Sequence, residues 1–138
     1  MYLVDTSISS YHQRGHPTVS QRIAATAVGL LYTSVVTVEE QFRGRLAVIA
    51  QNSQTPHRLI PAYVDLEQTL AYFRSWQVLS FTDQDYRTFL RLRRQGVRIS
   101  TRDLRISASA LGRGFIVVTG NVSDFNQVPH LVVEDWTV

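Results

Sequence analysis

The sequence predicts an α/β protein whose sheet is mostly parallel, five-stranded and covered by helices on both faces. Short apolar runs alternate with longer helical patterns along the chain, the first apolar run ends directly on an acid, and no repeat or low-complexity tract interrupts this order. Parallel strands need crossover connections, so alternating strands and helices are typical of such sheets. We expect residues 1–138 to form a single domain, which is long enough to bury a core without disulfides.

The expected elements follow from the spacing of the apolar residues. Strands are predicted at Tyr2–Val4, Leu30–Thr33, Val78–Leu79, Phe115–Val118 and Leu131–Val133. Helices are predicted at roughly 18–28, 35–50, 59–74, 83–95 and 101–112. Gly112 and Gly114 are typical of a helix end, and they precede the fourth expected strand.

Composition excludes several kinds of site. The chain has no cysteine, which rules out disulfides, thiolate zinc sites and cysteine nucleophiles. No apolar stretch is long enough to span a bilayer, and Asp5 lies where a signal peptide would need apolar residues, so we expect a cytoplasmic protein without a membrane segment. All 14 basic residues are arginine. Six of them crowd residues 91–105, which indicates either a polyanion-binding patch or a solvated helix face.

Acidic residues stand where chemistry is expected in this fold class. Asp5 ends the first strand and is followed by the hydroxyl residues Thr6 and Ser7. In open α/β sheets, ligands collect at this carboxyl edge of the strands. Three helix starts also carry a Ser or Thr followed three residues later by an acid, and capping of the helix explains each acid taken alone. These pairs are Thr37 with Glu40, Thr82 with Asp85, and Ser100 with Asp103.

Taken together, the acids indicate a metal site. Helices that follow strands begin at the same edge, so Asp5, Glu40, Asp103 and Asp124 are expected to converge there. Ionised carboxylates that share a pocket repel one another, and Mg²⁺ or Mn²⁺ would relieve that repulsion through oxygen ligands. Metals held in this way clamp phosphates and activate water, which favours phosphodiester chemistry.

Helical periodicity leaves open which of two neighbouring glutamates belongs to this site. Glu39 lies nearer than Glu40 to the apolar stripe of the second helix, yet a residue in the first turn can face the sheet edge from either position. The stripe, which we expect to be the buried face of that helix, consists of Val35, Val38, Phe42, Leu46 and Ile49.

Four groups of residues, taken in order along the chain, form a recognisable pattern. They are Leu3-Val4-Asp5-Thr6-Ser7; then Ser34, Thr37, Glu40 and Gly44; then Asp103, Leu104, Ile106 and Ala108; and finally Thr119, Asn121, Asp124, Phe125, Val128, Pro129 and Trp136. From Tyr2 to Trp136 the chain resembles the PIN-domain family, in particular the VapC-type ribonuclease toxins of bacterial toxin–antitoxin pairs. The register of this resemblance selects Glu40 over Glu39.

The resemblance implies a PIN-like three-layer fold and a Mg²⁺- or Mn²⁺-dependent ribonuclease that leaves a 3′-hydroxyl and a 5′-phosphate. Asp5 and Asp103 would hold the metal, and Glu40 would orient or deprotonate the attacking water. The implied partners are an RNA substrate, a second copy of the chain in a homodimer, and a cognate antitoxin received by a groove of the helices at 35–50 and 59–74.

The chain departs from the family pattern at Asn121, where many relatives carry aspartate. This leaves Asp124 as the expected fourth acid, with Thr6, Ser7, Thr119 and Asn121 in supporting positions. The departure motivates an alternative, a degenerate PIN-like module that binds RNA or protein without catalysis. A second alternative is a metal-dependent phosphatase that acts on small substrates with the same carboxylates.

Overall fold

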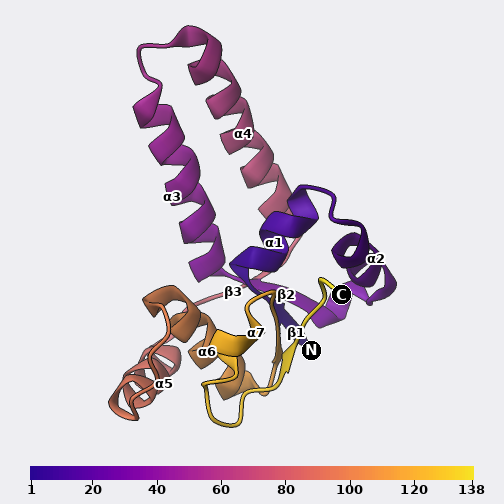
Figure 1. Cartoon of the computed structure of the whole chain (residues 1–138), viewed down its shortest axis with the longest axis vertical. Helices are drawn as coiled ribbons and strands as arrows, with labels where there is room; N and C mark the ends of the chain where they lie inside the picture. Colours follow the sequence, from indigo (N-terminus) through magenta and orange to yellow (C-terminus); the bar gives the residue numbers. More distant parts are fainter.

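The computed structural model describes residues 1–138 and contains one five-stranded sheet, in which all strands are parallel. The spatial order of the strands is β3-β2-β1-β4-β5 (Figure 1). Their bounds are β1 Tyr2–Val4, β2 Leu31–Ser34, β3 Gln77–Leu79, β4 Ile116–Val118 and β5 Val133–Glu134. The predicted α/β class and parallel five-stranded sheet are therefore confirmed.

Seven helices surround the sheet, namely α1 Thr6–Gln13, α2 Pro17–Ala25, α3 Val35–Gln51, α4 Pro56–Arg74, α5 Asp83–Arg94, α6 Thr101–Arg113 and α7 Val122–Phe125. The five predicted helices correspond to α2 through α6. Helices α1 and α7 were missed, because α1 is rich in serine and has no clear apolar stripe, while α7 is only a single turn. None of the helices is both long and apolar enough to cross a membrane.

Strand β1 lies in the middle of the sheet. The chain adds β2 and β3 on one side of it, and then β4 and β5 on the other side. Val4 pairs with Thr33 of β2 on one side and with Val118 of β4 on the other. The strand order therefore reverses at β1, and in parallel sheets such a switch point opens a crevice at the carboxyl ends of the strands. Residues that follow β1 and β4 line this crevice.

The central strand β1 is covered on both faces, as expected for parallel strands, whereas the edge strand β3 is largely exposed. Leu3 packs with residues of α6 and α7 on one face, whereas its neighbour Val4 packs with residues of α1 and α2 on the other. Both leucine and valine are fully buried. The strand β1 is thus clamped from two sides, and this fixes the direction in which the chain leaves it at Asp5.

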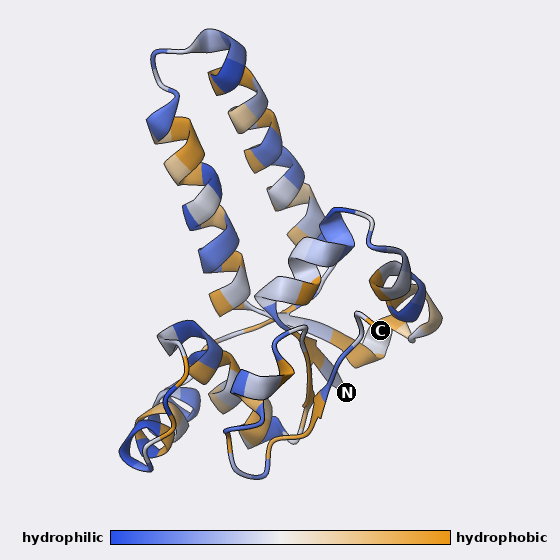
Figure 2. Cartoon of the chain, in the orientation of Figure 1, coloured by the Kyte–Doolittle hydropathy of each residue, from blue (hydrophilic) through white to orange (hydrophobic).

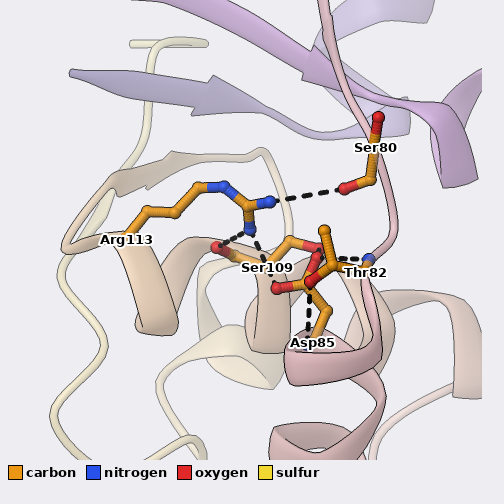
Figure 3. A network of polar contacts seen from close by, with 5 residues as sticks. All are labelled: Ser80, Thr82, Asp85, Ser109 and Arg113. Atoms are coloured by element: carbon orange, nitrogen blue, oxygen red, sulfur yellow. Dashed lines mark hydrogen bonds and ion pairs between the residues drawn. The ribbon is translucent and has the colours of Figure 1, made fainter.

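Helices α5 and α6 form a corner that is joined by a buried ion pair. Asp85 lies in the first turn of α5, and its Oδ1 is 2.9 Å from Nη1 of Arg113 in the last turn of α6 (Figure 3). Its other oxygen accepts from Ser109 Oγ and from the N–H of Thr82, which completes the predicted capping box. The network ties the start of α5 to the end of α6, the helix that carries Asp103.

The start of α3 differs from the prediction. Ser34 is the N-cap, and its Oγ accepts from the N–H of Val36 at 3.0 Å. Thr37 lies inside the first turn, where it is fully buried and its Oγ1 accepts from Thr6 Oγ1 at 3.1 Å. The predicted capping box between Thr37 and Glu40 is therefore wrong, because the helix begins two residues before Thr37.

Helices α3 and α4 extend away from the sheet as a two-helix arm, which we define as residues 35–74 (Figure 1). Figure 2 shows apolar stretches on both helices of the arm. The rings of Phe42 and Phe73 pack at 6.4 Å, but Val35 and Leu46 are exposed by 40% and 55%. The predicted buried stripe of α3 is therefore wrong at these positions, since most of the arm has only its partner helix to pack against.

Candidate active site at the carboxyl edge of the sheet

Asp5 connects the central strand to the first helix and is buried, with 3% of its surface exposed. Its N–H continues the sheet by donating to Val118 O at 3.0 Å. Its carboxylate caps α1, because Oδ1 accepts from the N–H of Ile8 at 2.9 Å and from Ser7 Oγ at 2.7 Å. The sequence thus places a carboxylate inside the protein by using it to begin a helix.

Thr119 follows β4 on the other side of the crevice and holds the second oxygen of Asp5. Its Oγ1 donates to Asp5 Oδ2 at 2.5 Å and accepts from the N–H of Asn121 at 2.8 Å. Thr119 is itself fully buried, and its N–H donates to Glu134 O. Both oxygens of Asp5 are therefore fixed by hydrogen bonds from residues on either side of the switch point.

Burial dominates the acid–base behaviour of Asp5. It raises the pKa of the carboxyl from 3.8 to about 6, although the hydrogen bonds from Thr119, Ile8 and Ser7 favour the ionised form. The charge of Asp103 adds to the increase in this pKa. Near neutral pH the carboxylate of Asp5 is therefore mostly ionised, and its hydrogen bonds offset only part of the free-energy cost of burying its charge.

Asp103 lies at the start of α6, where the N–H of Asp103 donates to Ser100 Oγ at 3.1 Å, as the helix-start pattern predicted. Burial raises the pKa of Asp103, and the charges of Glu40 and Asp124 raise it further, while hydrogen bonds with Ser100 and Asn121 lower it. The carboxylates expected to converge are thus close enough to oppose one another's ionisation.

The two neighbouring glutamates of α3 have different surroundings. Glu40 is half-buried, its charge raises the pKa of Asp103, and its Oε1 lies 3.7 Å from Nη1 of Arg102. Glu39 instead bonds Arg43 at 2.7 Å along the exposed side of the helix. Glu40, the glutamate that the family resemblance selects, is therefore the one that acts on the ionisation of Asp103.

Asn121 and Asp124 lie at the start of α7 and contact each other directly. Asn121 Nδ2 donates to Asp124 Oδ2 at 2.6 Å. Since the charge of Asp124 also raises the pKa of Asp103, the amide of Asn121 stands among acids and supplies donors to them. An aspartate at this position would instead add a further negative charge.

The hydroxyl residues after β1 complete the crevice. Thr6 Oγ1 donates to Thr37 Oγ1 and so joins α1 to α3, while Ser7 Oγ accepts from the N–H of Gly120 at 3.1 Å. Arg102 was missed as a site residue, although its place directly before Asp103 at a helix start was a usable signal. These contacts hold the elements that carry the acids in a fixed arrangement.

The donor set suits a hard divalent cation in its chemistry. It consists of carboxylate and hydroxyl oxygens, and the mutual repulsion of the carboxylates is what such a cation relieves. No three acidic or histidine side chains lie close enough together to hold one ion in this conformation, however. A bound ion would therefore need small rotations of Asp103, Glu40 or Asp124 toward the fixed carboxylate of Asp5.

Comparisons with known proteins show the family of the chain. A family model described as "PIN domain" matches residues 2–131. The plasmid stability protein StbB of Pseudomonas syringae pv. tomato is 31% identical over 142 aligned residues, covering 99% of each chain. The tRNA(fMet)-specific endonuclease VapC of Shigella flexneri is 29% identical over 139 residues, covering 99% of this chain and 98% of that protein.

A solved structure shares the fold over its full length. VapBC-1 from nontypeable Haemophilus influenzae superposes with a TM-score of 0.79 at 24% identity and covers 99% of this chain and 98% of the matched chain. The arrangement of strands and helices described above is therefore one that occurs in an experimentally determined protein.

Proposed function

Because the chain belongs to the PIN-domain family, we propose that it is a Mg²⁺- or Mn²⁺-dependent endoribonuclease, the toxin of a toxin–antitoxin pair. One observation carries this proposal: Thr119 and Ser7 fix the buried carboxylate of Asp5 at the carboxyl edge of the sheet, where the charge of Asp103 raises its pKa, and the charges of Glu40 and Asp124 in turn raise the pKa of Asp103. Such a cluster of oxygens suits a divalent cation and a phosphodiester substrate. The VapC relative, itself called an endonuclease, supports the nuclease activity.

We assign Asp5 and Asp103 to hold the metal and Asp124 to complete the acidic set. When bound, the ion would supply positive charge to the phosphate and lower the pKa of water. Thr119 and Ser7 keep the oxygens of Asp5 in place through hydrogen bonds of 2.5 and 2.7 Å, so that little reorganisation is needed during the reaction.

Glu40 orients the attacking water and accepts its proton. Water then attacks phosphorus, the bond from phosphorus to O3′ breaks, and the leaving O3′ takes a proton from solvent, so that the products are a 5′-phosphate and a 3′-hydroxyl. Arg102 Nη1 lies 3.7 Å from Glu40 Oε1 and holds this side chain beside α6. Asn121 restrains Asp124 by its hydrogen bond of 2.6 Å, and Thr6 anchors α1 to α3 beside Glu40.

The two-helix arm is our candidate for the antitoxin-binding surface. Its exposed apolar side chains would be covered by an amphipathic segment of a partner protein, as in other helix-in-groove complexes. Ile60 is 63% exposed, and the other such residues are Val35, Leu46, Val48, Tyr63, Val64 and Leu70. The homodimer and the cytoplasmic location expected from the sequence stay predictions.

A non-catalytic RNA- or protein-binding module is the alternative that one contact favours. The hydrogen bond between Asn121 and Asp124 occupies one oxygen of the expected fourth acid with a neutral donor. This alternative predicts RNA affinity that survives chelation of divalent metals and loss of the acids. A phosphatase for small substrates would be distinguished by the failure of RNA to compete for the site.

The decisive experiment is cleavage of total RNA and purified tRNA, including initiator tRNA, by the purified chain with Mg²⁺, Mn²⁺ or EDTA. We expect cleavage with Mn²⁺ or Mg²⁺, no cleavage with EDTA, and products with 3′-hydroxyl ends. Asp5→Asn is expected to be inactive, because it removes the buried charge while keeping the side-chain shape.

Asp83→Asn is the matched control, since Asp83 is an exposed acid that pairs only with Arg87 at the surface of α5. It is expected to cleave like the wild type. Full activity of Asp5→Asn in a nuclease-free preparation would contradict the proposed site. RNA binding without cleavage under every metal condition would instead support the non-catalytic module.

A further inference from the structure

A polar cavity opens between α1 and α3, directly beside the acidic cluster. Its volume is about 360 Å³, and none of the residues that line it is apolar. Thr6 and Glu40 of the proposed active site form one end of it, while Arg14 and Arg45 stand in its wall. The cavity is therefore continuous with the site where the phosphodiester would react.

A second cavity, of about 260 Å³, prolongs the first toward α4. The two cavities share Gln13, Arg14 and Arg45, and the second also reaches Thr69 and Tyr72. Together they form a polar groove that begins at the acids and passes between the two arginines. We call it the α1–α3 groove.

Arg45 is positioned in this groove by a partner that leaves its charge intact. Its Nε donates to Thr69 Oγ1 at 3.0 Å, and this hydroxyl in turn donates to Asp65 O at 2.8 Å. Thr69 is 1% exposed, so this anchor is rigid. No carboxylate lies within 4.0 Å of Arg45, and its terminal nitrogens bond no protein acceptor.

Arg14 is likewise held without being neutralised. Its guanidinium carbon lies 5.2 Å from the centre of the Tyr11 ring, a cation–π contact, and no carboxylate lies within 4.0 Å of it. Two other arginines near the acids, Arg43 and Arg102, are each paired with a glutamate. In the α1–α3 groove, the guanidinium groups of Arg14 and Arg45 are therefore held in place, and neither is paired with a carboxylate.

We propose that Arg14 and Arg45 bind a backbone phosphate of the RNA strand next to the scissile one, so that the α1–α3 groove sets the path of the substrate. The inference rests on the proposed nuclease function and assigns substrate-binding residues to it. Guanidinium groups bind phosphate oxygens through paired hydrogen bonds, and single-stranded RNA carries one such anion per nucleotide. Tyr72 is the one apolar residue in the lining of the two cavities, which argues against an amphipathic protein segment, because such a segment needs several apolar anchors.

The test separates binding from catalysis. The Asp5→Asn protein, which is expected not to cleave, is titrated into a labelled oligoribonucleotide of mixed sequence in the presence of EDTA, and binding is followed by fluorescence anisotropy. Adding Arg45→Gln or Arg14→Gln is expected to weaken binding roughly tenfold, the effect of losing a charge-assisted hydrogen bond. The salt dependence of log K should become shallower by about 0.7 for each lost phosphate contact.

Arg58→Gln is the matched control, because Arg58 is an exposed arginine of the arm with no carboxylate within 4.0 Å. It is expected to leave the affinity unchanged, and Arg45→Lys should keep part of it. In the active protein, Arg45→Gln should raise KM while kcat stays within about twofold of the wild type, since it removes binding shared by the ground and transition states. Thermal unfolding of each variant checks that the arm is intact.

The outcomes are distinct for the groove and for the nuclease. If the wild type cleaves RNA while Arg14→Gln and Arg45→Gln both keep full RNA affinity, the nuclease stands and the groove is not its substrate path. That result would indicate that the α1–α3 groove binds a protein segment instead of RNA. If the wild type neither binds nor cleaves RNA under any metal condition, both proposals fall.

Discussion

Thr119 donates its hydroxyl hydrogen to Asp5 over 2.5 Å, so that the residue after β4 holds the carboxylate that follows β1. Neighbouring strands in register bring the two residues together, although 114 positions separate them in the sequence. Both side chains are buried, and this direct hydrogen bond fixes the orientation of the Asp5 carboxylate. This contact is the point from which the remaining geometry of the site is built.

Replacing Thr119 by valine keeps the shape of the side chain and removes this donor. The pKa of Asp5 should rise further, because the hydrogen bond that favours its ionised form is lost. We expect cleavage to fall by about tenfold or more, as for loss of one hydrogen bond to a charged group. The measurement is kcat/KM with Mn²⁺, and Thr119→Ser, which keeps the hydroxyl, should remain near wild type. Equal activity of the valine and serine variants would contradict a role for the bond.

The raised pKa of Asp5 makes the metal-free protein less stable as pH rises. Below about pH 3.8 the carboxyl is protonated in both the folded and the unfolded state. Between this value and about 6 the unfolded chain releases its proton while the folded protein keeps it, so the free energy of unfolding falls. The total loss above pH 6 is about 3 kcal/mol, from 1.36 kcal/mol per pKa unit.

Urea unfolding in EDTA at a series of pH values measures this effect. The decline between pH 4 and 7 should be smaller in Asp5→Asn, whose neutral amide does not titrate. Added Mn²⁺ should then stabilise the wild type and leave Asp5→Asn nearly unchanged. A wild type and variant with parallel pH profiles would show that the burial of Asp5 has no such cost.

Asn121→Asp introduces the aspartate that the family resemblance predicts at this position. The new charge lies beside Asp124 and Asp103, so it should increase the affinity of the site for a divalent ion. We expect half-maximal cleavage at a lower Mn²⁺ concentration, by roughly tenfold for one added carboxylate contact. The control is Asn126→Asp, an exposed position after α7. An unchanged metal requirement would show that Asn121 already serves in place of the acid.

The ion pair between Asp85 and Arg113 should contribute to stability and not to catalysis. Burial raises the pKa of Asp85, but the Thr82 N–H and the Arg113 guanidinium outweigh it and hold this pKa below its usual range. Removing one partner leaves a buried charge unpaired, so Asp85→Asn or Arg113→Gln should cost about 2–4 kcal/mol. The exposed pair of Asp83 and Arg87 is the control, and its loss should cost less than about 1 kcal/mol.

Chemical denaturation provides both free energies of unfolding. Because Asp85 contacts Arg113, Ser109 and Thr82 and none of the acids of the cluster, kcat of the folded Asp85→Asn protein should be near that of the wild type. A large drop in kcat at full stability would instead indicate that the network of Figure 3 positions α6, and with it Asp103.

Local pattern was enough to predict much of the fold and the order of the acids. Five apolar runs gave five parallel strands, since buried strands must be apolar on both faces. Helix α1 escaped prediction because its start depends on Asp5 acting as a cap, and its serines give no stripe. The buried face that periodicity predicted for α3 is wrong at several positions of the arm. An apolar stripe shows that a helix has a packing face, but not how completely a neighbour covers that face.

The sequence by itself determined which residues can carry charge at the carboxyl edge: Asp5, Glu40, Asp103 and Asp124, in an order typical of the PIN-domain family. Only the tertiary structure decided how those charges behave. Burial, the hydroxyl of Thr119 and the mutual repulsion of the acids set the proton affinity of Asp5, and each of these depends on distances between segments far apart in the chain. The same holds for Arg45, whose anchor Thr69 lies on another helix, because a single helix cannot specify what faces it.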